Sequence, residues 1–100
     1  MENNQDNQHK IEIELPADVA GGQYSNIAII AHSAAEFIVD FAAILPGVPK
    51  AKVRSRIILN PENAKRLMLS LQENIARYEK HFGTIKSNGA KNPMMGGGFA

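Results

Sequence analysis

The stretch IILNPENAKRL, residues 57–67, constrains the fold of this chain more than any other. Asn60 directly before Pro61 is typical of a helix start, because the Asn side chain accepts hydrogen bonds from the first turn and proline fixes φ where no N–H is needed. Glu62 adds a negative charge where the helix dipole favours it. The chain therefore passes here from a strand into a helix.

The helix is predicted over residues 61–82 and ends before Gly83, which suits a C-terminal cap. Its apolar residues recur at spacings of three and four and so share one face. They are Ala64, Leu67, Met68, Leu71, Ile75, Tyr78 and Phe82. The same stripe fits a heptad, but Gln72 and Asn74 beside the seam lack the charges of a coiled coil. Packing on the protein's own sheet is therefore favoured over a zipper.

Four stretches before the helix are predicted as strands. Residues 24–32 and 51–59 are rich in β-branched or alternating residues, and residues 36–45 have period two, although their alanines also tolerate a helix. Residues 10–15 alternate three apolar residues with two glutamates, which is typical of a half-buried edge strand. The turn at residues 46–49, PGVP, separates the last two strands.

This order predicts an α+β domain of two layers. An antiparallel meander of about four strands precedes one long amphipathic helix, which packs on one face of the sheet. The single domain spans residues 10–83, between a disordered N-terminal tail of residues 1–9 and a disordered Gly-rich tail of residues 84–100.

Composition narrows the classes of function. The net charge of +1 gives no overall attraction for polyanions, and the absence of cysteine removes thiolate and disulfide chemistry. No signal peptide is visible, and no apolar run approaches the roughly 20 residues needed to span a bilayer. A soluble cytoplasmic protein without membrane association is expected.

No catalytic, metal or cofactor site is predicted. The three histidines lie far apart in the sequence and lack ligand spacing. His32 and Ser33, with the carboxylates of Glu36 and Asp40, form the one constellation with catalytic residue types. Adjacent strand residues point to opposite faces, however, so Ser33 is expected to bond the turn backbone instead. The chain is therefore expected not to be an enzyme.

Two surfaces are candidates for binding. The sheet face away from the helix is expected to be partly apolar, which favours a homodimer built sheet to sheet or edge to edge. Its self-association residues are Ile30, Ile38, Ile44 and Ile58. Four cations at period two, expected on one face of the last strand, are Lys50, Lys52, Arg54 and Arg56. These cations either track a nucleic-acid backbone or, as favoured, have a structural role, in which they pair with the carboxylates of Asp40 and Glu36 or simply keep the sheet soluble.

Short motifs along most of the chain resemble one bacterial family. They are Tyr24-Ser25-Asn26, His32-Ser33, Glu36-Phe37, Asp40-Phe41, Leu45-Pro46-Gly47, Ala51-Lys52-Val53, Arg56-Ile57-Ile58-Leu59, Pro61, Ala64-Lys65-Arg66 and Tyr78-Glu79. This pattern is similar to that of the domain of unknown function DUF3467, which implies a small intracellular bacterial protein with no assigned activity. The order of elements is also similar to that of the export chaperone SecB, without matching residues.

The sequence thus predicts a non-enzymatic binding or assembly module. It is expected to form a homodimer and to hold a protein or an extended peptide at a sheet face or edge. Nucleic-acid binding through Lys50, Lys52, Arg54 and Arg56 is the alternative.

Overall fold

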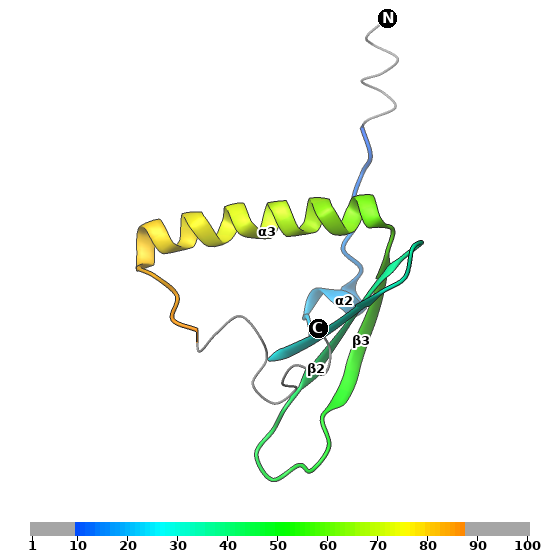
Figure 1. Cartoon of the computed structure of the whole chain (residues 1–100), viewed down its shortest axis with the longest axis vertical. Coiled ribbons are helices and arrows are strands. Elements are labelled where there is room, and N and C mark those ends of the chain that lie inside the picture. Colours follow the sequence, from blue (N-terminus) through cyan, green and yellow to red (C-terminus); the bar gives the residue numbers. More distant parts are fainter. Residues whose placement is uncertain (1–9, 88–100) are drawn as a thin grey trace, which may run out of the picture.

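A computed structural model describes residues 10–87 of the chain. Its elements follow the order α2 (Ala17–Ala20), β1 (Ile27–His32), β2 (Phe37–Ala43), β3 (Lys52–Leu59) and α3 (Pro61–Phe82) (Figure 1). The α+β class, the three consecutive antiparallel strands and the bounds of the long helix are confirmed. The tails predicted at residues 1–9 and 88–100 lie outside the described residues.

The three strands form one antiparallel sheet in the order β1-β2-β3. The turn between β1 and β2 is closed by a hydrogen bond from Ser33 N to Glu36 O at 2.9 Å. The Ser33 hydroxyl oxygen also accepts from Ala35 N and Glu36 N at 3.2 and 3.3 Å, as the sequence predicts. Between β2 and β3, Gly47 has a φ of +77°, which few other residues adopt without strain. Short turns therefore fix the pairing of all three strands.

A β-bulge interrupts the pairing of β2 with β3. Phe41 pairs with Ser55 but the next residue, Ala42, pairs with Val53, so Arg54 is an extra residue on β3. The strict alternation predicted for residues 51–59 therefore holds from Ser55 to Leu59 and fails toward the start of β3. Lys52 pairs with Ala43 and shares its face, whereas Val53 turns to the opposite face.

The register assigns the residues to two faces of the sheet. The face toward α3, called here the helix-facing face, includes Ile30, Phe37, Val39, Ile57 and Leu59. The opposite, far face includes Ile27, Ile38, Asp40, Ala42, Arg56 and Ile58. The predicted placement of Ile30 beside Ile38 and Ile58 is wrong, because Ile30 pairs with Val39.

The helix α3 has well-formed ends. The Asn60 side chain accepts from Asn63 N at 2.8 Å, and Pro61 occupies the first helical position. An ion pair joins Glu62 Oε2 to Arg66 Nη2 at 2.6 Å one turn later. Gly83, with a φ of +96°, ends the helix and donates its N–H to Glu79 O at 2.9 Å. The start and end signals in the sequence are confirmed.

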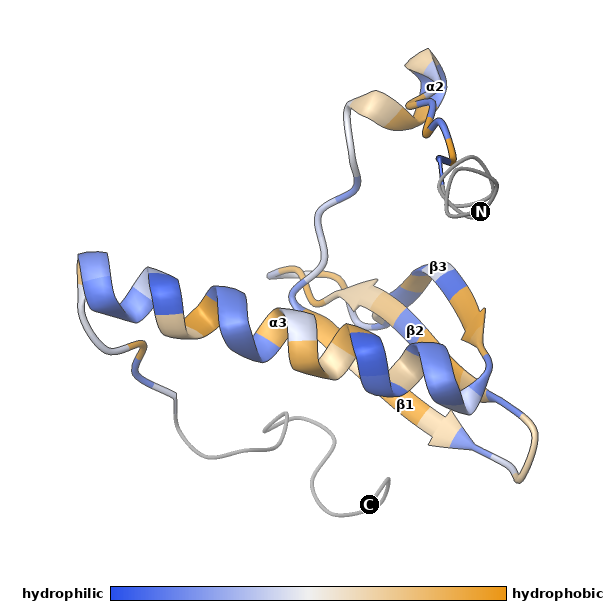
Figure 2. Cartoon of the chain, turned by 90° about the horizontal axis from the view of Figure 1, so that it is seen from above, coloured by the Kyte–Doolittle hydropathy of each residue, from blue (hydrophilic) through white to orange (hydrophobic). Residues whose placement is uncertain are grey.

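The fourth predicted strand is absent from the described residues. Residues 10–16 form neither helix nor strand, and the short helix α2 follows them directly. Figure 2 shows α2 standing away from the sheet at the end of an extended connection. We call residues 10–20 the N-terminal arm. Its alternating pattern is that of a strand, yet it pairs with no strand of the described sheet.

The predicted packing of the helix on one sheet face is not confirmed. The buried apolar residues are Ile27, Val39, Ala42 and Ala43, all in the sheet, and no residue of α3 is buried. Figure 1 shows only the first part of α3 near the sheet, while its C-terminal part extends beyond it. The core of a single chain is therefore small.

Candidate binding groove

A groove of about 510 Å³ lies between the first turns of α3 and the helix-facing face of the sheet. Apolar side chains form almost all of its walls, and Lys65 is its one charged residue. The lining residues are Ile30, Phe37, Val39, Leu59, Pro61, Ala64, Lys65, Leu67, Met68 and Leu71. Such a surface is suited to apolar side chains, because it offers very few hydrogen-bonding groups.

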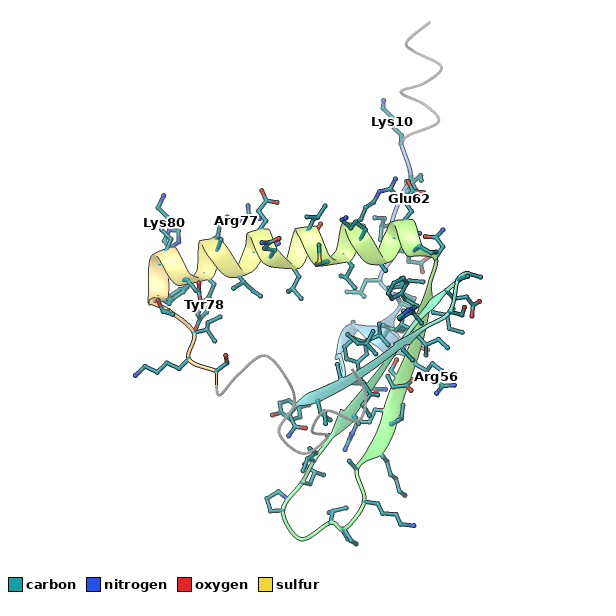
Figure 3. All side chains as sticks on the ribbon, viewed as in Figure 1. Lys10, Arg56, Glu62, Arg77, Tyr78 and Lys80 are labelled. Carbon is teal, nitrogen blue, oxygen red and sulfur yellow. The ribbon has the colours of Figure 1, made fainter. Side chains whose placement is uncertain are left out.

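The apolar stripe continues along α3 beyond the groove. Ile75, Tyr78 and Phe82 are exposed, with 75% of Phe82 accessible to solvent. The rings of Tyr78 and Phe82 lie 4.9 Å apart. Figure 3 shows Tyr78 on the sheet side of the helix and Arg77 and Lys80 on the other. A continuous apolar surface of this kind usually marks a site of interaction with another molecule.

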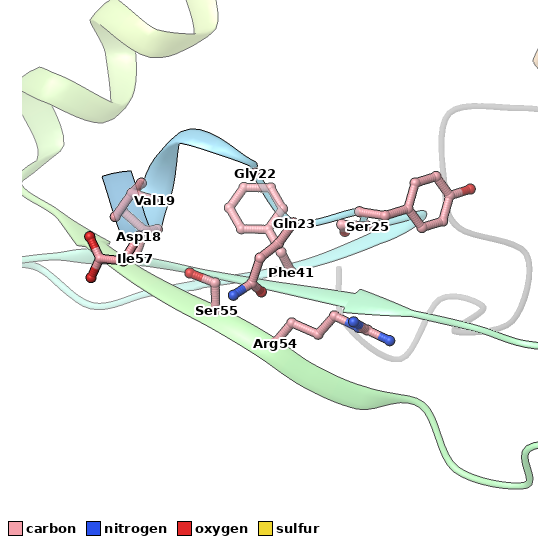
Figure 4. A pocket seen from close by; sticks show the side chains of 10 residues that line it. Asp18, Val19, Gly22, Gln23, Ser25, Phe41, Arg54, Ser55 and Ile57 are labelled. Carbon is pink, nitrogen blue, oxygen red and sulfur yellow. The ribbon is translucent and has the colours of Figure 1, made fainter. Parts of the chain in front are cut away.

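A second cleft, of about 540 Å³, opens on the same face of the sheet near α2 (Figure 4). Its lining is mixed, with Val19, Phe41 and Ile57 beside the Ser55 hydroxyl and the Arg54 guanidinium. Arg54 lines this cleft because the bulge turns it to the side of Ser55.

Asp40 and Arg56 form the sheet's one cross-strand ion pair among the described residues. Arg56 Nε and Nη2 donate to Asp40 Oδ1 and Oδ2 at 2.7 and 2.9 Å. The Asp40 side chain is 13% exposed, and that of Arg56 is 61% exposed. These hydrogen bonds, aided by the charge of Arg56, lower the pKa of Asp40 despite its partial burial. The same bonds raise the pKa of Arg56.

The four predicted cations do not form one row. Arg56 lies on the far face with Asp40, Lys52 shares the face of Ala43, and Lys50 precedes the strand. The predicted arrangement on one face is therefore wrong, and the bulge at Arg54 is the reason. The predicted pairing of this group with Asp40 is confirmed for Arg56.

The predicted self-association residues are divided between the two faces. Ile38 and Ile58 pair directly across β2 and β3 on the far face, where Ile58 is 56% exposed. Ile44 follows β2, and its backbone is bound by Asn26. Ile30 belongs to the groove instead.

Three of the four residues with catalytic types in the sequence make contacts with other groups. His32 stacks on Phe37 with ring centres 5.3 Å apart, and Ser33 bonds the turn backbone. Asp40 is held by Arg56. Within residues 10–87, no three histidine, aspartate or glutamate side chains lie close enough to hold one metal ion.

The main site missed from the sequence is the groove itself. The sequence places its helical residues in a core, because a helical apolar stripe is the usual signal of packing on a sheet, and it places Ile30 on the opposite face. The hydrogen bonds from the Asn26 side chain to the backbone of Ile44 are also not predicted from the sequence, although Ser25 and Asn26 belong to one of the motifs that resemble the family. Their role follows only from the register of β1 and β2.

The fold and the groove define a class of small α+β chain. In this class a three-stranded antiparallel sheet precedes a long helix that leaves an apolar surface open. The family model described as "Protein of unknown function (DUF3467)" matches residues 1–87, and the chain belongs to this family. No curated protein and no solved structure matches the chain. The predicted similarity to SecB is therefore not supported by these comparisons.

None of the described helices is long and apolar enough to cross a membrane.

Proposed function

We propose that this protein is a non-enzymatic binding and assembly module. It works as a homodimer and holds an extended apolar segment of another protein in the groove beside α3. The observation that carries this proposal is the lining of the groove, where nine of the ten residues are uncharged and nearly all are aliphatic or aromatic. An extended segment with alternating apolar side chains can insert every second one into such a groove.

The energetics suit a reversible partner. Each fully buried aliphatic side chain contributes roughly 1.5–3 kcal/mol, so three anchors give about 5–9 kcal/mol before the cost of association. Net affinities in the micromolar range or weaker are expected from such a balance. Binding of this strength is typical of a protein that captures and releases segments of a partner.

The homodimer is supported by the small core of one chain. The residues of α3 are all exposed to some degree, and large apolar residues stay accessible on the helix and on both sheet faces. Domains of this size bury a limited fraction of their surface, and self-association is a common remedy. A second copy would cover part of this surface.

The groove can be tested with a labelled peptide of alternating leucine and serine, followed by fluorescence anisotropy. Leu67 lines the groove and is 49% exposed, so Leu67→Glu is expected to weaken binding at least tenfold without unfolding the chain. Leu69 on the same helix is 50% exposed and lies outside the groove. The matched variant Leu69→Glu should bind the peptide as the wild type does.

If both variants lose binding equally, or if neither loses it, the peptide does not bind in the groove. Added salt distinguishes binding of an apolar segment from binding of nucleic acid. Apolar binding should hold or strengthen in high salt, whereas binding to a phosphate backbone falls steeply with salt. Capture of nucleic acid that is lost in a Lys52→Ala/Arg54→Ala variant would favour the basic strand as the binding site instead.

A further inference from the structure

The N-terminal arm carries an apolar strand pattern that its own chain leaves in solvent. Ile11, Ile13 and Leu15 are 75%, 91% and 68% exposed, and Glu12 and Glu14 alternate with them. Within the described residues, no hydrogen bond to the backbone of residues 10–15 is formed. Three large apolar side chains on an unpaired extended segment are costly in water, so a partner for this segment is expected.

The outer edge of β3 is the complementary surface. In the sheet order β1-β2-β3, β3 pairs on one side with β2, and no described strand pairs with its other side. Its residues Ile57 and Ile58 are 43% and 56% exposed. Figure 1 shows α3 leaving the end of β3 toward the opposite side of the sheet, so the helix does not cover this edge. An open edge of this kind is a ready template for another strand.

We propose that residues 10–15 of one copy of this chain add to the outer edge of β3 of a second copy. The strands run antiparallel, with Ile13 opposite Ile57, and a twofold axis makes the exchange reciprocal. This inference rests on the homodimer of the proposed function and names the contact that forms it. The sheet of each copy then has a fourth strand, supplied by its partner.

The register of this exchange follows from which side chains share a face. With Ile13 opposite Ile57, Ile11 lies opposite Leu59 and Leu15 opposite Ser55. These three positions continue the helix-facing face, where Leu59 already lines the groove. A slip of one residue would place the glutamates on this apolar face and the isoleucines on the other, which disfavours it strongly.

Charge selects the β3 edge over the β1 edge. In the proposed register Glu14 lies opposite Arg56 on the far face, and Glu12 is a diagonal neighbour of Arg56. Arg56 uses two of its nitrogens for Asp40 and keeps 61% of its side chain exposed, so its remaining N–H groups can donate to a second carboxylate. The strand β1, IAIIAH, carries no lysine or arginine. Opposite charges across neighbouring strands stabilise the pairing.

The geometry of the single chain favours a second copy as the source of the strand. Residues 10–15 are not paired with their own sheet, and Figure 2 shows the helix α2 that follows them at the end of an extended connection, although the edge of β3 in the same chain is open. An unpaired segment with a strand pattern, together with an unfilled matching edge on every copy, is the arrangement from which reciprocal strand exchange arises.

Disulfide trapping tests the contact directly, because the chain contains no cysteine. Ile13→Cys and Ile57→Cys variants with different tags are refolded together and oxidised. Directly opposed antiparallel residues have Cα atoms about 4.5–5.5 Å apart, within the range for a disulfide. A mixed dimer carrying both tags is expected, well above the yield from the control mixture of Ile13→Cys with Leu69→Cys. Absence of the mixed dimer, or equal yield in the control, overturns the proposal.

Two further pairs fix the direction of the strand. The Ile11→Cys and Leu59→Cys mixture should form a disulfide if the strands are antiparallel. The Leu15→Cys and Leu59→Cys mixture should do so if they are parallel, and this result would overturn the proposed register. A disulfide formed only inside a chain that carries both Ile13→Cys and Ile57→Cys would show that the arm folds onto its own sheet.

The exposed arm also allows a variant that spares the fold. Ile13→Asp changes a side chain that is 91% exposed in the single chain, so the monomer should keep its circular dichroism spectrum. Its molar mass by light scattering should fall from that of a dimer to that of one chain. Peptide binding in the groove should remain, whereas Leu67→Glu should lose the peptide and keep the disulfide-trapped dimer. An Ile13→Asp variant that stays dimeric overturns the exchange without touching the groove.

Discussion

The side chain of Asn26 pairs with the backbone of Ile44 as a residue of a neighbouring strand would. Its Nδ2 donates to Ile44 O at 2.9 Å, and its Oδ1 accepts from Ile44 N at 2.7 Å. Beside it, the Ser25 hydroxyl donates to Ala42 O at 2.9 Å. Ser25 and Asn26 directly precede β1, so their side chains extend the pairing of β1 with β2 beyond the first residue of β1. They also fix where the connection from the N-terminal arm enters the sheet.

Asn26→Asp should therefore destabilise the protein more than its similar shape suggests. The substitution removes the donor to Ile44 O and places a carboxylate beside that carbonyl oxygen. A loss of about 1–2 kcal/mol in the free energy of unfolding is expected, because both the hydrogen bond and an unpaired carbonyl are involved. Urea unfolding measures this loss. Asn74→Asp, which removes a helical side-chain bond to Ser70 O, is the matched control. Equal effects of the two substitutions would contradict a special contribution of the Asn26–Ile44 hydrogen bonds to stability.

The Asp40–Arg56 pair predicts how stability depends on pH. Hydrogen bonds from Arg56 lower the pKa of Asp40 in the folded protein, so the folded state binds this proton less readily than the unfolded chain. The stabilisation is fully present above the unfolded pKa of about 3.9 and is lost as pH falls through the lower folded value. Urea unfolding between pH 7 and pH 2 should show this loss.

The variant Asp40→Asn isolates the effect of this one carboxyl. The difference in stability between wild type and variant should be constant above about pH 5 and shrink toward lower pH. A difference that grows on acidification would mean that the pKa of Asp40 is raised, contrary to its contact with Arg56.

Local signals made much of this fold predictable. Asn60, Pro61 and Gly83 fix the ends of α3 through caps and backbone angles, which act within one turn and so can be read from neighbouring residues. Strand positions were predictable for a similar reason, because period-two patterns and the turn at Gly47 are local.

Features that depend on pairing between distant segments were not predictable. The bulge at Arg54 reverses the faces of Lys52 and Val53, and no residue type near it signals the shift. The placement of Ile30 depends on its pairing with Val39, a relationship that a turn without glycine does not specify. The segment at residues 10–15 has the pattern of a strand, yet it pairs with no strand of the described sheet, and pairing of this kind is not encoded in a local pattern.

Adding a side chain at Gly47 should lower the stability of the protein through backbone strain alone. Its φ is +77°, and a Cβ there would meet no atom within 4 Å. Gly47→Ala is expected to cost about 1–2 kcal/mol of stability, the penalty of a left-handed conformation. Gly21 is the matched control, since it also has open space but a φ of −72°. Gly21→Ala should leave the midpoint of urea unfolding unchanged or raise it slightly.

Capping of α3 by Asn60 should contribute both to the stability of the helix and to peptide binding in the groove. Its side chain accepts from Asn63 N at 2.8 Å, and the first three turns of the helix form one wall of the groove. Asn60→Ala is expected to cost about 1 kcal/mol and to weaken peptide binding, because the frayed first turn carries Pro61 and Ala64. Asn60→Asp should preserve both, since it also accepts this bond. Asn63→Ala removes only an exposed bond from Arg66 and keeps the backbone N–H that Asn60 caps. If Asn63→Ala weakens peptide binding as much as Asn60→Ala does, the wall of the groove does not depend on the cap.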